Sequence, residues 1–406
     1  MRQIIEPKQV GLSSDRLSKI SRWMRRYVDE GKLPFAMTLV ARRGEVAFFD
    51  LVGMRDVKNR YPIGADTIMR FYSMTKPITT VAAMMLYEEG HFQLDSRIAD
   101  FVPCLGDMEI YVTSEKGQLK SRPSRNPITF QHLMTHTSGF IYGFGDDSPL
   151  AEQYQFNRTD FDIDSGKLEG VVGRLSSLPL AHEPGTSWHY GVSTDVLGYL
   201  VEVISGKSLR DYMMERIFLP LGMEDTDFGI PMEKLGRFSC LYEFDRLAGM
   251  RLADSADDTR YVLDNVVTYS GGGGLMSTMP DYYRFTKLLR NKGEVHGQRL
   301  LGRKTVDYMT CNHLPGDLAA MGQPTFNETT YEGIGFGLGF SVMLEPAKAG
   351  VVGSSGEYAW GGMASTAFWI DPTEDMTVIF LTQLSPSDAY PLRRELRVLT
   401  YQALVD

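Results

Sequence analysis

The chain has 406 residues, 43% of them hydrophobic and 23% charged, which suits one large or two medium folded domains and argues against disorder. Its net charge of −9 argues against nucleic acid or an anionic membrane surface as the main partner. The polar stretch 1–10 lacks the apolar core of a signal peptide, and no apolar run is long enough to cross a membrane. Three widely spaced cysteines suggest neither a metal knuckle nor a disulfide framework, so we expect reduced thiols in a cytoplasmic protein.

The first 90 residues carry signals for a helix, a hairpin and a second helix. Ser13-Ser14-Asp15 precedes apolar residues at helical spacing, which predicts a capped amphipathic helix. The apolar runs 35–41 and 46–52 flank a polar turn and predict a β-hairpin. A strand-like stretch, 67–72, then leads into an apolar helix that includes 81–87.

From about residue 95 to 265 the pattern changes to short helices and long loops, with few strand signals. Helices are predicted at 130–136, 193–204 and 209–218. The stretch 142–149 is rich in Gly and Asp, so we interpret it as a candidate pocket loop.

Strand signals return after residue 264. We predict strands at 331–342, 364–370 and 376–381, and helices from Pro280 and over 391–404. Because strands occur at both ends of the chain, we expect them to pair into one antiparallel sheet covered by helices. This α+β organisation predicts a discontinuous α/β sandwich domain, 1–95 and 265–406, with a mainly helical domain, 96–264, inserted between its two parts.

The most informative short motif is Ser73-Met74-Thr75-Lys76. Residues three apart share a helix face, so the Ser73 hydroxyl and the Lys76 amine can meet at the start of the helix. The helix N-terminus adds partial positive charge, and burial beside such charge can lower a lysine pKa enough for the amine to act as a base. This is the pattern of an activated nucleophile. The motif alone is equally consistent with a serine cap and an exposed lysine.

Tyr190 is a candidate proton relay. It lies in a polar, Gly-containing loop just before the helix predicted at 193–204, rather than in an apolar stripe. A tyrosine held near a lysine can pass protons as a phenol and phenolate pair. An ordinary half-buried tyrosine is the alternative interpretation of this segment.

The segment Trp360-Gly361-Gly362-Met363 is a candidate oxyanion hole. Two glycines allow the main chain to approach a ligand closely. The N–H of Met363 could then face a developing oxyanion together with the N–H of Ser73. The alternative is a glycine pair that only relieves crowding at a sheet edge.

Taken together, these segments resemble the serine β-lactamase and penicillin-binding-protein superfamily, and most of all its family VIII carboxylesterases. Ser73–Lys76 is similar to the Ser-x-x-Lys box, Tyr190 to the tyrosine of the Tyr-x-Asn box, and Trp360-Gly361-Gly362 to the Lys-Thr-Gly box. The three boxes occur in the expected order. The resemblance also includes His136-Thr137-Ser138-Gly139, Glu183-Pro184-Gly185 and the tetraglycine 271–274.

The resemblance implies a β-lactamase-like fold and a serine carboxylesterase that hydrolyses short to medium acyl esters through an acyl-enzyme. It implies Ser73 as nucleophile, Lys76 and Tyr190 as proton acceptors, and the N–H groups of Ser73 and Met363 as the oxyanion hole. It implies no metal or organic cofactor, a small-molecule ester as the partner and no particular oligomeric state. For the substrate-binding wall we expect Trp360, Gly361, Gly362, Tyr142 and Phe144.

Two departures from the β-lactamase pattern bear on the substrate. Val192 stands where Asn or Ser is expected, and Trp360 stands where a lysine would bind the β-lactam carboxylate. Loss of that charge-assisted contact favours neutral esters and predicts weak or absent β-lactam hydrolysis.

Several alternatives remain open at this point. The same site could carry out acyl transfer, amide hydrolysis, or β-lactamase or D-Ala-D-Ala peptidase chemistry, or the fold could serve as a non-catalytic binding protein. His132 and His136 are four apart, as zinc ligands on a helix can be, but the sequence offers no third ligand, so we expect structural histidines. The run 353–357 fails the Gly-x-Ser-x-Gly pattern at its last position, which argues against an α/β-hydrolase.

Overall fold

The computed structural model describes residues 4–115, 118–145, 147–247, 249–326 and 329–406. Residues 1–3, in the stretch examined for a signal peptide, and Asp146, in the expected pocket loop, lie outside the described residues. The helices are α1 (Ser14–Asp29), α2 (Thr75–Glu88), α3 (Phe130–Met134), α4 (Pro149–Phe156), α5 (Leu168–Leu175), α6 (Ser193–Ser205), α7 (Leu209–Met213), α8 (Leu219–Leu221), α9 (Met279–Arg290), α10 (Arg303–Met309), α11 (Pro346–Ala349) and α12 (Leu392–Tyr401). The strands are β1 (Phe35–Arg42), β2 (Glu45–Asp56), β3 (Tyr61–Pro62), β4 (Met69–Arg70), β5 (Glu109–Glu115), β6 (Gln118–Pro123), β7 (Leu241–Asp245), β8 (Gly249–Asp254), β9 (Met276–Ser277), β10 (Glu294–Val295), β11 (Gln298–Arg299), β12 (Thr325–Phe326), β13 (Thr329–Thr330), β14 (Ile334–Phe336), β15 (Ser341–Met343), β16 (Tyr358–Gly361), β17 (Ala367–Asp371), β18 (Met376–Leu381) and β19 (Leu384–Ser385).

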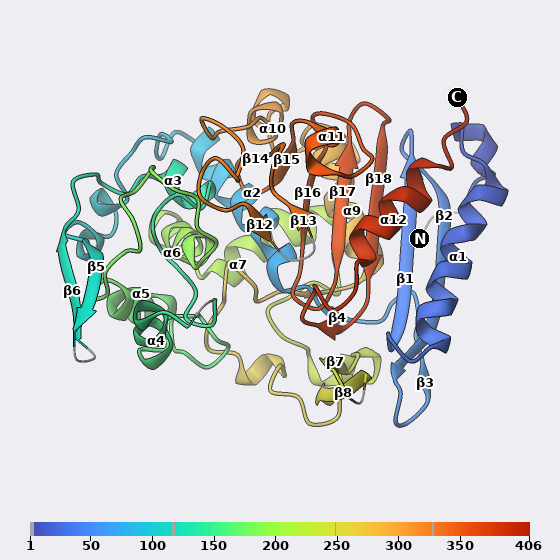
Figure 1. The fold of residues 1–406 in the computed structure, drawn as a ribbon, viewed down its shortest axis with the longest axis horizontal. Helices are drawn as coiled ribbons and strands as arrows, with labels where there is room; N and C mark the ends of the chain where they lie inside the picture. Colours follow the sequence, from blue (N-terminus) through green and yellow to red (C-terminus); the bar gives the residue numbers. More distant parts are fainter. Residues whose placement is uncertain (1–3, 116–117, 146, 248, 327–328) are drawn as a thin grey trace.

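One antiparallel sheet joins the two ends of the chain, as predicted. Its strand order is β14-β15-β16-β17-β18-β1-β2-β3. The N-terminal hairpin β1–β2 meets the C-terminal strands through β1 and β18, where Leu39 pairs with Ile379. Figure 1 shows this junction, with the blue strands directly beside the red ones. The α+β class and the pairing of the two chain ends are therefore confirmed.

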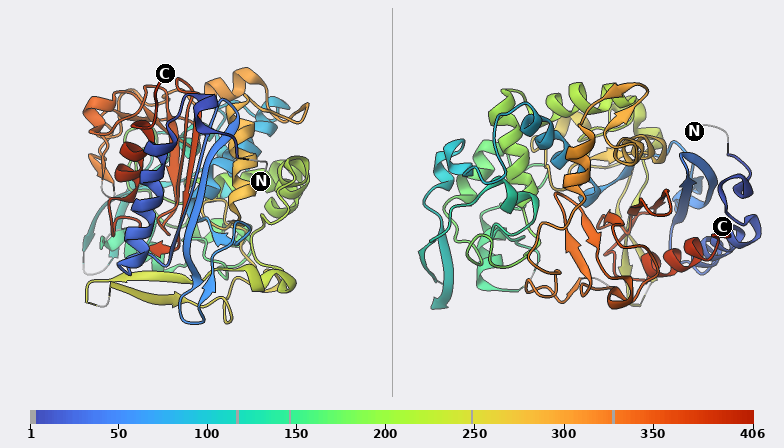
Figure 2. Two further views of the ribbon diagram at one scale, coloured as in Figure 1. Left: turned by 90° about the vertical axis from the view of Figure 1, so that its right-hand side faces the viewer. Right: turned by 90° about the horizontal axis from the view of Figure 1, so that it is seen from above.

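Helices cover both faces of this sheet. All eight residues of β1 are buried, and alternate residues face opposite sides. Met37 and Leu39 belong to the hydrophobic cluster that contains α2 and α9, whereas Ala36 and Val40 belong to the cluster that contains α1 and α12. Figure 2 shows α1 and α12 side by side across one face of the sheet. The result is a three-layer arrangement of helices, sheet and helices.

The part of the chain between residues 95 and 265 contains more strand than we expected. It includes the hairpin β5–β6 and the hairpin β7–β8, which pairs through β7 with β19. Most residues of β5 and β6 are at least partly exposed, so neither strand shows the apolar alternation that marks a half-buried strand. The expectation of few strands in this region is corrected accordingly.

The strand predicted at 331–342 is two short strands. The chain reverses between β14 and β15, because Gly339 adopts a positive φ of 86° and packs against Thr80. A Cβ at Gly339 would overlap the Thr80 hydroxyl, so this turn requires glycine.

The helices α3 to α7 gather at the end of the molecule away from α1 (Figure 1). This arrangement supports the division that we propose, with 96–264 as a helical domain beside the sandwich 1–95 and 265–406. Ile230, Phe238 and Tyr242 nevertheless pack in the cluster that contains α1 and α12. No helix among the described residues is both long and apolar enough to span a bilayer.

Candidate active site

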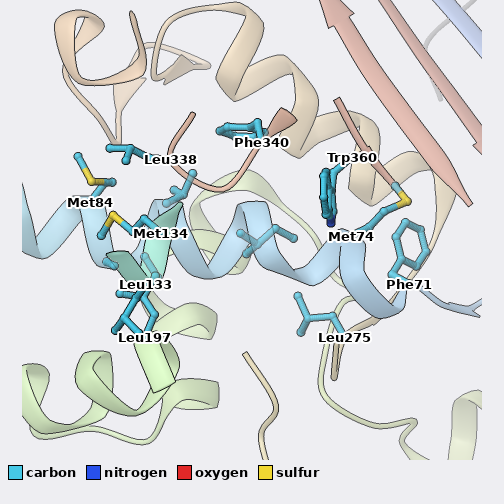
Figure 3. Packing of buried hydrophobic residues seen from close by; sticks show 14 of the residues in the cluster. Phe71, Met74, Met84, Leu133, Met134, Leu197, Leu275, Leu338, Phe340 and Trp360 are labelled. Carbon is cyan, nitrogen blue, oxygen red and sulfur yellow. The ribbon is translucent and has the colours of Figure 1, made fainter. Parts of the chain in front are cut away.

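The Ser-x-x-Lys segment lies at the start of the most enclosed helix of the molecule. Ser73 is the middle residue of a 3-10 turn, Tyr72–Met74, and Lys76 is the second residue of α2. Residues 75–86 of α2 are all buried, so this helix packs on every side. Figure 3 shows α2 running between residues of the helical part, such as Leu133, and residues of the sheet side, such as Trp360. The nucleophile candidate thus lies in the turn that directly precedes this buried helix.

The residue before Ser73 has a strained main chain. Tyr72 has a φ of 45°, in the left-handed region that residues other than glycine seldom adopt. Strain of this kind costs about 1–3 kcal/mol and is retained where the surroundings enforce it. On its N-terminal side, the Phe71 N–H donates to the Leu275 carbonyl at 3.0 Å, which fixes the entry to the turn.

Three predicted residues meet at Ser73 Oγ. Lys76 Nζ lies 3.1 Å from Ser73 Oγ, as the three-residue spacing predicts. The Tyr190 hydroxyl, which comes from the loop before α6, donates to Ser73 Oγ at 2.7 Å. The serine oxygen therefore contacts an amine and a phenol, the two kinds of group that can take its proton.

Lys76 has two further partners. Its Nζ lies 2.9 Å from the Tyr142 hydroxyl and 2.7 Å from the Gly272 carbonyl oxygen. The lysine is 1% exposed, so these contacts replace water around the amine. Burial raises the pKa of Tyr142 well above its usual value, which keeps its phenol neutral and able to donate or accept. Tyr142, expected in the pocket wall, thus also contacts the lysine.

Asp195 is a buried acid that the motif analysis missed. It lies on α6, and its Oδ1 accepts hydrogen bonds from the Ser270 hydroxyl at 2.5 Å and from the Gly272 N–H at 2.8 Å. The same Gly272 residue accepts from Lys76 through its carbonyl, so Asp195 holds the peptide segment that contacts the lysine. Burial raises the pKa of Asp195 to about 6. The available sequence signal was an acid, Asp195, in the first turn of a largely apolar helix, α6.

Packing against Asp195 explains why one residue of the tetraglycine 271–274, Gly272, must be glycine. A Cβ added at Gly272 would overlap Oδ2 of Asp195, so the close contact between the two requires glycine.

The glycines of the candidate oxyanion hole pack against the turn that carries Ser73. Gly361 is the last residue of β16, and a Cβ at Gly362 would overlap the carbonyl oxygen of Phe71. The main chain of 361–363 consequently passes next to the segment that leads into Ser73. Met363 and Ser73 line the same cavity. These placements suit the predicted oxyanion hole, which stays a prediction.

The cavity above Ser73 has a volume of about 710 Å³, and several aromatic rings form part of its wall. Trp360 is 8% exposed, and its ring centre lies 5.5 Å from that of Tyr190. Phe144 stacks on Tyr142 with ring centres 4.6 Å apart and is 61% exposed at the cavity mouth. Figure 3 shows the Trp360 ring pointing toward the start of α2, near Met74. All five expected wall residues, Tyr142, Phe144, Trp360, Gly361 and Gly362, border this cavity.

The two histidines, His132 and His136, pack within the protein as structural residues. His132 Nδ1 accepts from the Thr129 N–H and closes the capping box of α3. His136 is enclosed by aromatic rings, and burial lowers its pKa well below the usual value. Within the described ranges, no group of three or more His, Cys, Asp or Glu side chains is arranged to hold a metal ion.

Comparison with known protein families shows the family to which the chain belongs. The family model described as Beta-lactamase matches residues 20–402. The chain belongs to the β-lactamase family. This confirms the resemblance inferred from the three boxes.

Three named relatives match this chain over most of their own length and most of its length. Protein Rv1367c of Mycobacterium tuberculosis is 33% identical, with 89% of each chain covered. Esterase EstB of Burkholderia gladioli is 28% identical and covers 87% of this chain and 86% of its own. ML-236A carboxylate methylbutanoyltransferase of Penicillium citrinum is 26% identical, with 87% and 86% covered.

A solved structure supports the fold. The structure of EstCE1, described as a hydrolase with promiscuous acyltransferase activity, matches with a TM-score of 0.81 at 24% identity. The match covers 97% of this chain and 99% of that one. The β-lactamase-like fold is thereby confirmed.

Proposed function

We propose that this protein is a serine carboxylesterase that hydrolyses short to medium acyl esters through an acyl-enzyme intermediate. The observation that carries the proposal is the position of Ser73 Oγ, 2.7 Å from the Tyr190 hydroxyl and 3.1 Å from Lys76 Nζ, beside a cavity partly lined by aromatic rings. The relationship to esterase EstB, over 87% of the chain, supports the same reaction class.

The reaction begins when Ser73 Oγ attacks the ester carbonyl carbon. Its proton passes to the pair formed by Tyr190 and Lys76, which both contact that oxygen. To accept it, the pair must start one proton short of a phenol and an ammonium, with either a phenolate or a neutral amine. The carbonyl oxygen becomes an oxyanion held by the N–H groups of Ser73 and Met363. Tyr190 then returns a proton to the leaving alcohol as the carbon–oxygen bond breaks, and the acyl group stays on Ser73.

Deacylation repeats these steps with water as the nucleophile. Water gives its proton to the same pair and attacks the acyl carbon, and Ser73 leaves with a proton returned from Tyr190. Tyr142 and Gly272 hold the amine of Lys76 in place through both halves of the reaction.

One residue of the cavity wall, Trp360, supports a neutral substrate. The resemblance of 360–362 to the Lys-Thr-Gly box implies that this indole stands where a β-lactamase has a cation for the substrate carboxylate. We therefore expect neutral esters to be hydrolysed and β-lactams to be hydrolysed weakly. We also place the protein in the cytoplasm, because Cys104, Cys240 and Cys311 are all free thiols, which suits a reducing compartment.

A second candidate is acyl transfer on the same site. The methylbutanoyltransferase relative, covering 87% of the chain, supports it. The acyl-enzyme would then pass its acyl group to an acceptor alcohol in place of water. Adding a primary alcohol to the ester assay separates the two reactions: a hydrolase forms mainly the free acid, and a transferase forms mainly the new ester.

The test is hydrolysis of p-nitrophenyl acetate, butyrate and octanoate by the wild type and by Ser73→Ala. We expect the variant to lose at least about 10³-fold in kcat/KM, since no other group replaces the nucleophile. Ser18→Ala is the matched control, because the Ser18 hydroxyl donates to the Asp15 carbonyl and accepts from the Arg22 guanidinium, both within α1. Activity that survives in Ser73→Ala would refute the assignment, and a chromogenic cephalosporin turned over faster than the esters would favour a β-lactamase.

A further inference from the structure

Arg393, near the start of α12, reaches the main chain of the candidate oxyanion hole. One guanidinium nitrogen, Nη2, donates to the carbonyl oxygen of Gly362 and to that of Thr366, each at 3.2 Å. The Gly362 N–H also donates to the Thr366 carbonyl, at 3.0 Å. One cation therefore contacts both ends of the loop 362–366, which contains Met363.

Gly361 explains how the guanidinium fits there. A Cβ added at Gly361 would lie 2.7 Å from Nη2 and 2.9 Å from Cζ of Arg393. Any side chain at this position would displace the arginine from the loop. The first glycine of the pair thus makes room for Arg393, while the second allows the close approach to Phe71.

The carbonyl oxygen of Gly362 and the N–H of Met363 are two ends of one peptide unit. Resonance makes that unit planar and couples the charge on its oxygen to the charge on its nitrogen. A cation bonded to the oxygen draws electron density toward it, so the N–H at the other end becomes a stronger donor. No hydrogen bond among the described residues involves this Met363 N–H, which borders the cavity above Ser73.

We propose that Arg393 is a positioning residue of the oxyanion hole, where its guanidinium fixes the Gly362–Met363 peptide and strengthens the Met363 N–H as a donor to the reacting carbonyl. This inference rests on the proposed esterase function. It explains why an arginine on the last helix lies against a glycine pair at the end of β16, although neither belongs to the proton-transfer network.

The experiment compares p-nitrophenyl butyrate with p-nitrophenyl thionobutyrate, in which sulfur replaces the carbonyl oxygen. Sulfur accepts hydrogen bonds weakly, so the oxygen-to-sulfur ratio of kcat/KM measures the strength of the oxyanion hole. In Arg393→Met we expect kcat on the oxygen ester to fall about tenfold to a hundredfold, below the loss of a whole oxyanion donor. The ratio should shrink by about tenfold while KM changes by less than about twofold. Arg393→Lys keeps the charge and should fall between the two proteins.

Arg16→Met is the matched control, because Arg16 also donates from a guanidinium to a main-chain carbonyl, that of Gln402 just after α12, at 2.9 Å. Its ratio should equal that of the wild type. An unchanged ratio in Arg393→Met, or a rise in KM alone, would overturn the inference and reduce Arg393 to a structural or substrate-binding residue. If Arg393→Met does not fold, Arg393→Lys and Arg393→Gln give the same ratio test.

The rate at which a fluorophosphonate labels Ser73 separates this inference from the proposed function. That reaction also develops charge on an oxygen in the oxyanion hole but needs no ester turnover. A wild type that is labelled yet hydrolyses neither ester would refute the esterase, while slower labelling of Arg393→Met would still support Arg393. Equal labelling of the two proteins would refute the role of Arg393.

Discussion

The site around Ser73 has two parts: side chains that exchange hydrogen bonds form its first side, and the main chain of residues 361–363 forms its second side. The first side contains Lys76, Tyr190 and Tyr142, whose polar atoms are linked through distances of 2.7–3.1 Å. The second side consists of a glycine pair pressed between the Phe71 carbonyl and Arg393. The first side is suited to proton transfer. The second side has only main-chain N–H groups, which are suited to hydrogen bonding a developing negative charge.

The two sides differ in the kind of substitution that would disable them. A proton relay depends on the chemical type of a few side chains, so a substitution that keeps the shape but removes the polar atom should disable it. An oxyanion site made of main chain depends on what surrounds it, so a single added methyl group should disable it without any change of polar atoms. Lys76→Met and Gly362→Ala test the first side against the second, and Tyr142→Phe and Asp195→Asn test which contacts around Lys76 the first side needs.

The largest effect is expected for Lys76→Met, which keeps a long buried side chain and removes the amine. We expect kcat/KM for p-nitrophenyl butyrate to fall by about 10³-fold, because Tyr190 alone must then accept the serine proton. The control is Lys304→Met, whose side chain is 83% exposed and should leave activity unchanged. Retention of more than a tenth of the activity would show that the amine is not required.

The main-chain side is tested by Gly362→Ala. Its Cβ would overlap the Phe71 carbonyl and the Thr366 hydroxyl, so the strand end must move away from Ser73. We expect kcat to fall by about 10²-fold, as for the loss of an oxyanion donor. Gly173→Ala adds the same methyl group in α5, where nothing lies within 4 Å, and should be silent. A fully active Gly362→Ala enzyme would mean that this main chain does not contact the reacting oxygen.

The same difference explains what could be predicted from the sequence. The contact between Ser73 and Lys76 follows from residues three apart on one helix, and the pairing of both chain ends follows from apolar runs typical of strands. Tyr190 could be proposed from its residue type and its loop. The sequence therefore predicts those parts of the site and fold in which local spacing or residue type decides the outcome.

The parts that were missed depend on contacts between distant segments. Asp195 reaches Gly272, and Arg393 reaches Gly362, through packing that no local pattern encodes. The hairpin β5–β6 is largely exposed, so its strands lack the alternation of a half-buried sheet. The helical and strand elements at both chain ends were predictable because they bury a continuous face.

A smaller effect is expected for Tyr142→Phe, which removes one partner of the lysine and keeps the ring. We expect kcat to fall about tenfold, because the amine loses a contact that fixes its position, and stability to fall by about 1 kcal/mol. Tyr154→Phe is the matched control: Tyr154 is also buried, and its hydroxyl donates to the Pro179 carbonyl rather than contacting the lysine. The control should lose similar stability with no change in kcat. Equal kcat losses in both variants would mean that Tyr142 acts only through stability.

The smallest effect on activity is expected for Asp195→Asn, because the amide oxygen can still accept from Ser270 and Gly272. The substitution should instead change how the free energy of unfolding depends on pH. Burial raises the folded-state pKa of Asp195 to about 6, whereas an unfolded aspartate has a pKa of about 4. Between these values the folded state binds the proton more tightly, so this group stabilises the wild type below about pH 4 and loses that contribution as pH rises to 6.

Thermal unfolding of the wild type and of Asp195→Asn at pH 4, 5, 6 and 7 checks the direction of this pH dependence. The melting temperature of Asp195→Asn relative to the wild type should rise by a few degrees between pH 4 and 6 and stay level above that. Asp225→Asn is the opposite control, because hydrogen bonding to Arg237 lowers the pKa of Asp225 to about 2. Its difference from the wild type should change only below about pH 4, where the wild type loses the ion pair. A level difference for Asp195→Asn from pH 4 to 7 would mean that Lys76 and the hydrogen bonds from Ser270 and Gly272 stabilise the carboxylate enough to offset its burial.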